Sequence, residues 1–285
     1  MKTYRPHPST YTGLIQQAIS EDMPFGDITT SCTVASHTQG KAVILAKEDC
    51  VAAGLFVAQE VFAHVDSSIA CRIMFDEGAV VHAGGILMEI HGSLASILMG
   101  ERVALNLLQR LCGIATQTAA FMKELNGTDC RLLDTRKTTP GLRVLEKYAV
   151  RVGGGHNHRF SLSDGVLIKD NHIAACGSIT EAVRRLRRNA PHTLAVQCEV
   201  STMEALQEAL SVGVHAVLLD NMDTDTLKKA VDFTRKTAPR VLIEASGGVT
   251  LKNVREIALT GVDMVSTGSI THSVKAVDIS LRILQ

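Results

Sequence analysis

Basic side chains are concentrated in one short stretch of this chain. Between Thr135 and Ser163 there are six lysines and arginines and a single acid, Glu146, although the 285-residue chain has a formal net charge of zero. Glycines and threonines are interleaved with these cations in segments 134–141 and 153–159. A local excess of this kind indicates a site for a small ligand with several carboxylates or phosphates. The candidate binding cations are Arg136, Lys137, Arg159 and Lys169.

The other cations of this stretch have the spacing of a helix face. Arg143, Lys147 and Arg151 stand four residues apart, and Glu146 falls among them. This i, i+4 pattern predicts a solvated helical surface. We therefore do not expect these three side chains to bind a ligand.

Histidines in the same region allow a different chemistry. His156 and His158 form a His-x-His pair, and with His172 they offer ligands for a transition metal. Positive charge on Arg159 and Lys169 would repel a dication, however. A histidine that hydrogen-bonds an anionic substrate, or that orients Arg159, is the favoured interpretation, and the metal site is the alternative.

Composition excludes several classes of protein. With 46% hydrophobic and 20% charged residues, the chain can bury a large core as one barrel-sized domain or two smaller ones. Residues 1–12 are polar with two prolines, and no apolar span of about 18 residues follows, so we expect a cytoplasmic protein without a membrane segment. Seven scattered cysteines without a Cys-x-x-Cys pair predict free thiols.

From about residue 130 onward, apolar runs alternate with helical segments, which is typical of βα units and a parallel sheet. We expect helices at 178–188 and 201–210, because Ser178 and Ser201 each have a glutamate three positions on, as in a capping box. Such a sheet is either a β/α barrel or an open doubly wound sheet, and the polar residues at the strand ends favour the barrel. Because only six strands are counted, the predicted fold class is α/β with an open, incomplete β/α barrel. The expected strands are residues 131–134, 165–169, 194–200, 216–220, 241–245 and 263–267.

Polar residues stand at or just after the carboxyl ends of these strands. In a barrel such positions converge on one rim, where barrel enzymes hold their catalytic groups. The last two loops are glycine-rich and predict a phosphate site built from backbone N–H groups. No P-loop and no Gly-x-Gly-x-x-Gly motif follows a strand. The rim residues are Arg136, Lys137, Lys169, Glu199, Asp220, Ser246-Gly247-Gly248 and Thr267-Gly268-Ser269.

The first 110 residues predict a separate domain with both helices and strands. We expect a strand at 41–47, a helix at 54–65 and short strands between 71 and 92. An apolar-striped helix at 99–111 then leads into the βα region.

Two acids give the rim a second chemistry. Glu199 and Asp220 end neighbouring strands, where they would hold a divalent cation, bind ribose hydroxyls, or act as general acid and base. Either acid alone is as often a cap or a rim salt bridge. Together with the cations and the glycine loops, they suit a phosphorylated sugar that reacts with an acidic partner.

At these residues the chain resembles the quinolinate phosphoribosyltransferases, the carboxylating nicotinate-nucleotide pyrophosphorylases of NAD synthesis. The resemblance implies an N-terminal α/β sandwich domain at 1–112, completed by the tail 272–285, and an open β/α barrel at 113–271. It also implies a homodimer, or a higher oligomer, with each site at the subunit interface. The motifs that carry it are 21–22, 26–29, 100–106, 134–141, 146–148, 153–159, 167–172, 219–221 and 244–248.

The same resemblance implies a reaction. Quinolinate and phosphoribosyl pyrophosphate would give nicotinate mononucleotide, pyrophosphate and carbon dioxide, with Mg²⁺ as the cofactor. The substrate carboxylates would be held by Arg136, His158, Arg159, Lys169 and, from the partner subunit, Arg102. Lys137 would neutralise phosphate charge, while Glu199 and Asp220 would act in catalysis beside the ribose and magnesium. The 5′-phosphate would lie in Ser246, Gly247, Gly248, Thr267, Gly268 and Ser269, with Thr135 and His272 lining the pocket.

Three alternatives stay open at this point. A pyrophosphorylase paralogue of molybdenum transport shares the fold, although the intact motifs 134–139 and 169–172 resemble the quinolinate enzymes. A nicotinate-using phosphoribosyltransferase would need fewer cations for its monocarboxylate. A nucleic-acid-binding protein is disfavoured by neutral charge, an aromatic content of only 4%, and the acids Glu199 and Asp220 near the predicted site.

Overall fold

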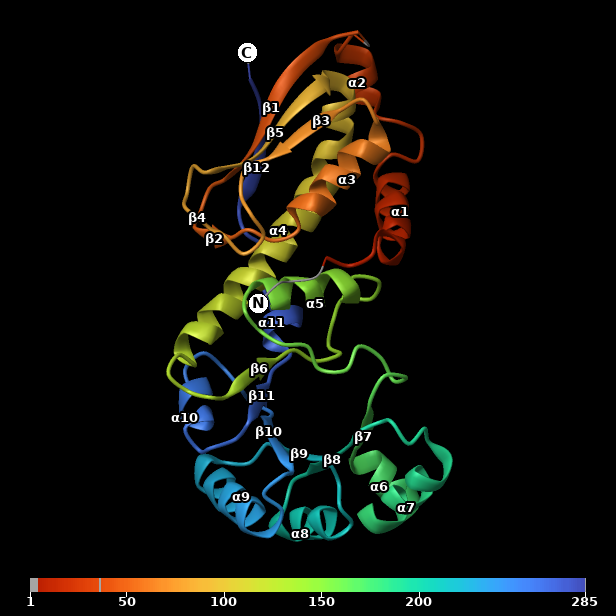
Figure 1. Cartoon of the computed structure of the whole chain (residues 1–285). Helices are drawn as coiled ribbons and strands as arrows, with labels where there is room; N and C mark the ends of the chain where they lie inside the picture. Colours follow the sequence, from red (N-terminus) through yellow and green to blue (C-terminus); the bar gives the residue numbers. More distant parts are fainter. Residues whose placement is uncertain (1–4, 36, 285) are drawn as a thin grey trace. The chain divides into compact units, whose positions relative to one another are not determined.

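The computed structural model describes residues 5–35 and 37–284, which form two compact units (Figure 1). The first unit contains the described residues up to 119, together with 138–154 and 270–284. The second unit contains residues 120–137 and 155–269. Among the helices of the described part, none is both long and apolar enough to cross a membrane.

The second unit contains the predicted parallel six-stranded sheet. Its strand order is β6-β11-β10-β9-β8-β7, so that β6 and β7 stand at the two ends. Apolar residues such as Val217, Ile243 and Val265 are fully buried, as expected for a sheet that is covered on both faces. The strands are β6 (Arg131–Leu133), β7 (Val166–Ile168), β8 (Val196–Val200), β9 (Ala216–Asp220), β10 (Leu242–Ser246) and β11 (Met264–Ser266).

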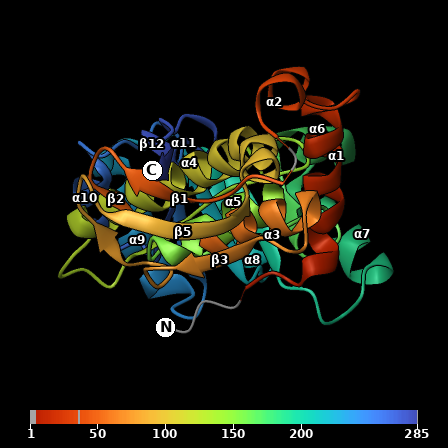
Figure 2. The same ribbon diagram turned by 90° about the horizontal axis from the view of Figure 1, so that it is seen from above.

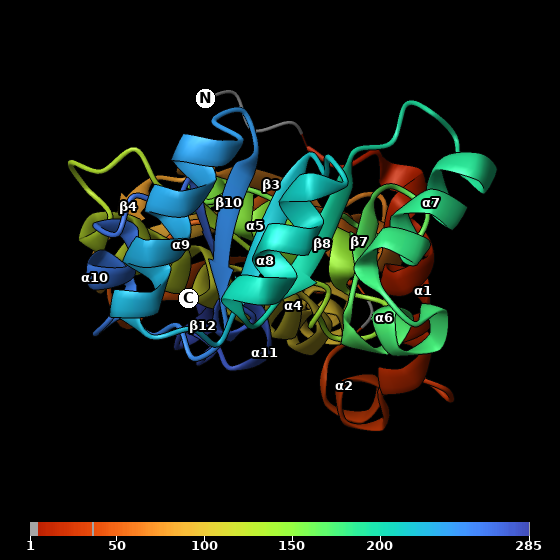
Figure 3. The same ribbon diagram turned by 90° about the horizontal axis from the view of Figure 1, so that it is seen from below.

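Helices alternate with these strands along the chain, and Figure 3 shows α8 in front of β8 and β10, with α9 beside β10. The Ser178 hydroxyl caps α7 as predicted, by accepting the Glu181 N–H at 3.1 Å. The predicted cap Ser201 is wrong by one residue, because Thr202 accepts the Ala205 N–H at 3.2 Å instead. The helices are α6 (Asp170–Cys176), α7 (Ile179–Asn189), α8 (Met203–Ser211), α9 (Thr224–Thr237) and α10 (Val254–Ala258).

The first unit is built on a four-stranded antiparallel sheet, with the order β12-β1-β5-β3. Figure 2 shows β1, β5 and β3 side by side. The chain's last strand pairs with β1, from Lys41 opposite Leu284 to Ala46 opposite Ile279. The strands are β1 (Gln39–Ala46), β3 (Ala70–Ile73), β5 (Ile86–Ser93) and β12 (Ile279–Leu284), with a separate pair of β2 (Cys50–Val51) and β4 (Val80–Val81).

The long helix α4 (Leu94–Glu124) extends well beyond the predicted 99–111. Its Gly113 allows the C-terminal segment to pass close by, because a Cβ at this position would lie 2.4 Å from the Lys275 carbonyl oxygen. The other helices of this unit are η1 (Pro8–Thr10), α1 (Thr12–Asp22), α2 (Ile28–Thr33), α3 (Leu55–Val65) and α5 (Arg143–Val152); α11 (Ser269–His272) follows β11.

Helix α5 corrects one prediction. Arg143 and Arg151 are partly exposed, but Glu146 and Lys147 are fully buried, so the helix does not present a solvated charged face. Buried Glu146 accepts a hydrogen bond from Arg110 Nε at 2.7 Å and another from the Thr139 N–H at 3.2 Å. The i, i+4 spacing was correct for a helix, but it could not show which side packs against protein.

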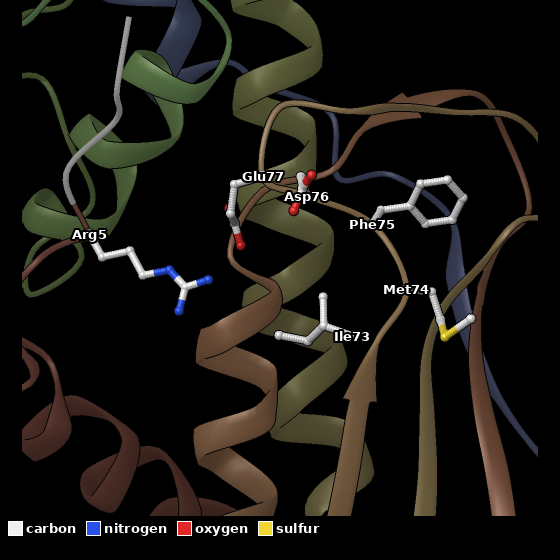
Figure 4. A pocket seen from close by; sticks show the side chains of 6 residues that line it. All are labelled: Arg5, Ile73, Met74, Phe75, Asp76 and Glu77. Carbon is white, nitrogen blue, oxygen red and sulfur yellow. The ribbon is translucent and has the colours of Figure 1, made fainter.

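A cavity of about 340 Å³ in the first unit is lined by Arg5 and residues 73–77. Figure 4 shows the Arg5 guanidinium directed toward Glu77. The Glu77 carboxylate is already used by the fold, because it accepts the N–H groups of Gly54 at 2.7 Å and Leu55 at 2.9 Å at the start of α3. This acid is therefore a helix cap.

Glu77 gives a pH-dependent stability that can be measured. Burial raises the pKa of Glu77, although the two N–H donors oppose this. A carboxyl with a raised pKa in the folded state stabilises most below its ordinary pKa, and this contribution is lost as pH rises through the folded value. In urea unfolding across the weakly acidic range, wild type should lose stability with rising pH relative to Glu77→Gln. Parallel pH profiles for the two proteins would contradict this.

Candidate active site

The carboxyl ends of the parallel strands surround a cavity of about 540 Å³ in the second unit. Most of the predicted site residues line it. They come from the loops after β6 and β7, from the segment between α5 and β7, and from the ends of β8, β9 and β10. The lining residues from the predicted set are Thr135, Arg136, Lys137, His158, Arg159, Lys169, Glu199, Asp220, Ser246, Gly247 and Gly248.

Five predicted residues are not part of this lining. Thr267, Gly268 and Ser269 belong to the second unit, where the Thr267 and Ser269 hydroxyls lie 2.9 Å apart. Arg102 and His272 belong to the first unit. Their predicted roles stay predictions.

Arg136 and Arg159 bring like charges together at the cavity. Burial lowers the pKa of Arg159 below its ordinary value, and the positive charge of Arg136 lowers it further. An anion placed between them would relieve this repulsion, so the pair is suited to binding a carboxylate. The Arg159 side chain is held in place by a hydrogen bond from Nη1 to the Gly165 carbonyl oxygen at 2.8 Å.

The loop after Arg159 is closed by Asp164. Its carboxylate accepts the N–H of Phe160 at 2.7 Å and the N–H of Ser161 at 2.8 Å. Burial opposes ionisation, but these backbone hydrogen bonds outweigh it and lower the pKa of Asp164. The loop that carries Arg159 is therefore tied back on itself by an ionised side chain.

A buried acid also fixes the segment before Arg159. Asp134 is fully buried, and it accepts hydrogen bonds from Asn157 Nδ2 at 2.6 Å and from the His158 N–H at 2.8 Å. Because Asp134 directly follows β6, it links the loop of Arg136 to the segment that leads into Arg159. This explains why the 134–137 and 156–159 motifs lie together.

Lys169 and Glu199 form an ion pair across the ends of β7 and β8. Their predicted roles require different ligands, a substrate carboxylate for Lys169 and a ribose or metal for Glu199. The pair neutralises both charges within the protein. Binding at either side chain would therefore exchange this contact for one with substrate.

The glycine turn after β10 has a backbone that favours glycine. Gly247 has φ +93° and Gly248 φ +61°, and Asn221 opposite them also has a positive φ, of 54°. A Cβ on Gly247 would lie 2.1 Å from Asn221 Oδ1. Glycine at 247 therefore permits a close approach of two loops at the predicted phosphate site.

The cavity offers carboxylates as possible metal ligands. No group of three His, Cys, Asp or Glu side chains able to hold a metal occurs in the part of the chain that the structure describes, so the His156, His158 and His172 site is not formed. Glu199 and Asp220 do line one cavity. Magnesium commonly uses one or two carboxylates together with substrate phosphates and water, so these two acids fit it.

Sequence reasoning missed several residues of the cavity, of which Glu244 is the most informative. Glu244 is 1% exposed and precedes Ser246 by two positions in β10. Since side chains alternate along a strand, the presence of Ser246 at the rim was a signal that Glu244 shares its face. The other missed residues are Leu167, Leu218, Asn221 and Ser266.

These features define a class of protein: an α/β enzyme whose parallel strands end at a cavity for small, multiply charged anions. The chain belongs to the quinolinate phosphoribosyltransferase family. Residues 27–112 match the N-terminal domain of quinolinate phosphoribosyl transferase, and residues 114–282 match its C-terminal domain.

Relatives along the whole length support this assignment. A probable nicotinate-nucleotide pyrophosphorylase (carboxylating) of Bacillus subtilis is 44% identical over 268 residues, covering 94% of this chain and 91% of the relative. Quinolinate phosphoribosyltransferase (decarboxylating) 1b of Nicotiana tabacum is 40% identical, covering 97% and 83%. The crystal structure of NadC from Streptococcus pyogenes matches with a TM-score of 0.93 and 41% identity, covering 99% and 100%. These names favour the quinolinate interpretation over the molybdenum-transport paralogue.

Proposed function

We propose that this chain transfers the phosphoribosyl group of phosphoribosyl pyrophosphate to quinolinate and releases carbon dioxide, forming nicotinate mononucleotide and pyrophosphate. The observation that carries the proposal is a single cavity that combines four cations with strand-end acids and a glycine turn. A dicarboxylate and a sugar diphosphate together need this combination. The names of the relatives specify which dicarboxylate.

Each group of side chains has a proposed task. Arg136, Arg159 and Lys169 bind the two carboxylates, with His158 beside them. Gly247 and Gly248 present backbone N–H groups to the 5′-phosphate. The hydroxyl and glycine residues that complete the phosphate site are Ser246, Thr267, Gly268 and Ser269, with Thr135 and His272 at its edge.

The chemistry has two steps. The bond from the ribose anomeric carbon to pyrophosphate breaks, its electron pair leaves with pyrophosphate, and the pyridine nitrogen lone pair forms the new bond. Lys137 stabilises the departing negative charge, and Glu199 and Asp220 face the positive ribose. The carboxylate next to the ring nitrogen then leaves as carbon dioxide, and the ring carbon keeps the electron pair and takes up a proton.

Magnesium would be held by Glu199 and Asp220. When bound, it supplies positive charge for the diphosphate leaving group. Orientation of the pyridine and of the ribose remains the task of the side chains named above.

The proposal also includes an open β/α barrel, two domains and a homodimer. An open β/α barrel is supported by the strand order, in which β7 to β11 follow the chain and β6 comes after β11. The domain division at 1–112 and 113–271, with the tail 272–285 on the first domain, is retained. We infer a homodimer in which Arg102 of each subunit completes the other subunit's site.

The proposal is tested by incubating purified protein with quinolinate, phosphoribosyl pyrophosphate and magnesium chloride. Nicotinate mononucleotide should form, and its formation should stop when quinolinate is replaced by nicotinate. Equal turnover of nicotinate would contradict the proposed substrate, since a monocarboxylate leaves part of the cation set unused.

A further inference from the structure

Glu244 is a buried carboxylate in the cavity for which the proposed chemistry has no use. Its Oε2 accepts a hydrogen bond from Gln197 Nε2 at 2.7 Å and lies 3.4 Å from His158 Nε2. Its Oε1 has no hydrogen-bond partner among the described residues. The nearby Ser266 hydroxyl donates to Ser246 at 3.0 Å, and it also helps to lower the pKa of Glu244. One oxygen of the buried Glu244 carboxylate therefore lacks a direct hydrogen bond of good geometry among the described residues.

Such an arrangement does not stabilise the fold well. A buried carboxylate oxygen without a donor has lost its hydration and has gained nothing in exchange. Burial raises the pKa of Glu244, but hydrogen bonds from the side chains of His158, Ser266 and Gln197 outweigh this and lower it. An ionised carboxylate at this position points to a function beyond packing.

The contacts of His158 indicate which of its ring nitrogens carries the proton. The backbone N–H of Arg159 donates to His158 Nδ1 at 2.8 Å. A backbone N–H is always a donor, so Nδ1 must carry a lone pair. The ring proton of the neutral imidazole is then on Nε2, which is the nitrogen that faces Glu244.

Glu244 thus reaches Arg159 through one intermediate ring. The His158 ring contacts Glu244 through Nε2 and accepts the Arg159 backbone N–H at Nδ1. The backbone N–H of His158 donates to Asp134. The backbone of His158 and Arg159 is therefore restrained by two buried acids, directly by Asp134 and through the His158 ring by Glu244. A rotation of the imidazole would release one of these two restraints.

We propose that Glu244 is a positioning residue for recognition of the acidic substrate: it orients His158, which fixes the main chain at Arg159 and directs the guanidinium into the cavity. This inference rests on the proposed function for the identity of that substrate. It also assigns His158 a role inside the protein in addition to any contact with a carboxylate.

Steady-state kinetics of Glu244→Ala and Glu244→Gln test the proposal. A displacement of about 1 Å can cost up to a hundredfold, so we expect Glu244→Ala to raise KM for quinolinate about tenfold. KM for phosphoribosyl pyrophosphate should change less than about twofold. Glu244→Gln keeps an acceptor for His158 and should recover most of the loss; it also keeps the test valid if the alanine variant does not fold.

A double-mutant cycle shows whether Glu244 acts through Arg159. In an Arg159→Ala background, Glu244→Ala should lower kcat/KM for quinolinate by less than about twofold, because the residue it positions is gone. Asp263→Asn is a matched control. Asp263, just before β11, is also an acid that contacts β10, since it accepts the Ile243 N–H at 2.7 Å. Unlike Glu244, it does not line the cavity. This variant should leave both KM values unchanged.

The ring itself can be observed by ¹⁵N NMR of histidine-labelled protein, with the His158 signal assigned by its loss in His158→Asn. We expect the shift of an unprotonated Nδ1 and a protonated Nε2 at neutral pH in wild type, and a mixture of tautomers in Glu244→Ala. A protonated Nδ1 in wild type would overturn the proposal, as would equal losses in kcat/KM with and without Arg159 or equal increases in both KM values. Absence of product with wild type would instead refute the proposed function, and the NMR result would still decide the role of Glu244.

Discussion

Arg159→Ala is expected to lower kcat/KM for quinolinate about tenfold to a hundredfold. Each hydrogen bond between a charged side chain and a substrate carboxylate contributes about 1.5–3 kcal/mol, and the Arg159 side chain is already held at the cavity by Gly165. The loss should appear mainly in KM for quinolinate if the contact exists before bond breaking as well as during it. Steady-state rates with each substrate varied in turn measure this.

An arginine elsewhere on the same unit provides the control. Arg184 on α7 is exposed and pairs with Glu181 in the same helix, with Nε to Oε2 at 2.7 Å. Exposed pairs contribute little to stability, so Arg184→Ala should keep wild-type kinetics. Near-full activity of Arg159→Ala would remove Arg159 from the proposed carboxylate site, whatever the control shows.

Gly247→Ala is expected to lower kcat/KM for phosphoribosyl pyrophosphate by about a hundredfold. The new Cβ would lie 2.1 Å from Asn221 Oδ1 and 3.0 Å from the Asn221 backbone nitrogen, at φ +93°. The two loops must separate, which would move the N–H groups that we assign to the 5′-phosphate. A shift of about 1 Å in such a cradle is enough for a loss of this size.

The variant Gly248→Ala distinguishes the effect of a steric clash with Asn221 from the effect of backbone strain. Gly248 also has a positive φ, of +61°, but a Cβ there would meet no atom within 4 Å. Gly248→Ala should therefore cost only the strain of a left-handed alanine, about 1–2 kcal/mol of folding stability, and a small part of the activity. Equal kinetic losses in both variants would show that the close approach to Asn221 is not what matters.

The strand pattern was predictable because it depends on local physics. Short apolar runs separated by capped helices predicted all six strands of the parallel sheet. The polar residues that end or follow five of these runs line one cavity, whereas Thr267, Gly268 and Ser269 after the sixth do not. Parallel strands bring those ends together regardless of how distant they are in sequence.

The sequence did not show which charged side chains are buried. Lys147 was assigned to a solvated face and is fully buried, and Glu244 was not assigned to the site at all although it lines the cavity. Helical spacing or position in a strand gives the face of a side chain, but only the packing of distant elements decides whether that face meets water. The Lys169–Glu199 pair was missed for the same reason, since each residue had been given a ligand outside the protein.

In the proposed reaction, one cavity couples phosphoribosyl transfer to the loss of one particular carboxylate. The most direct measurement uses quinolinate labelled with ¹⁴C in the carboxylate next to the ring nitrogen, and compares labelled carbon dioxide released with nicotinate mononucleotide formed. One carbon dioxide should be released for each nucleotide formed, and none when phosphoribosyl pyrophosphate is omitted. Nucleotide that retains the label, or carbon dioxide released without nucleotide, would contradict the proposed reaction.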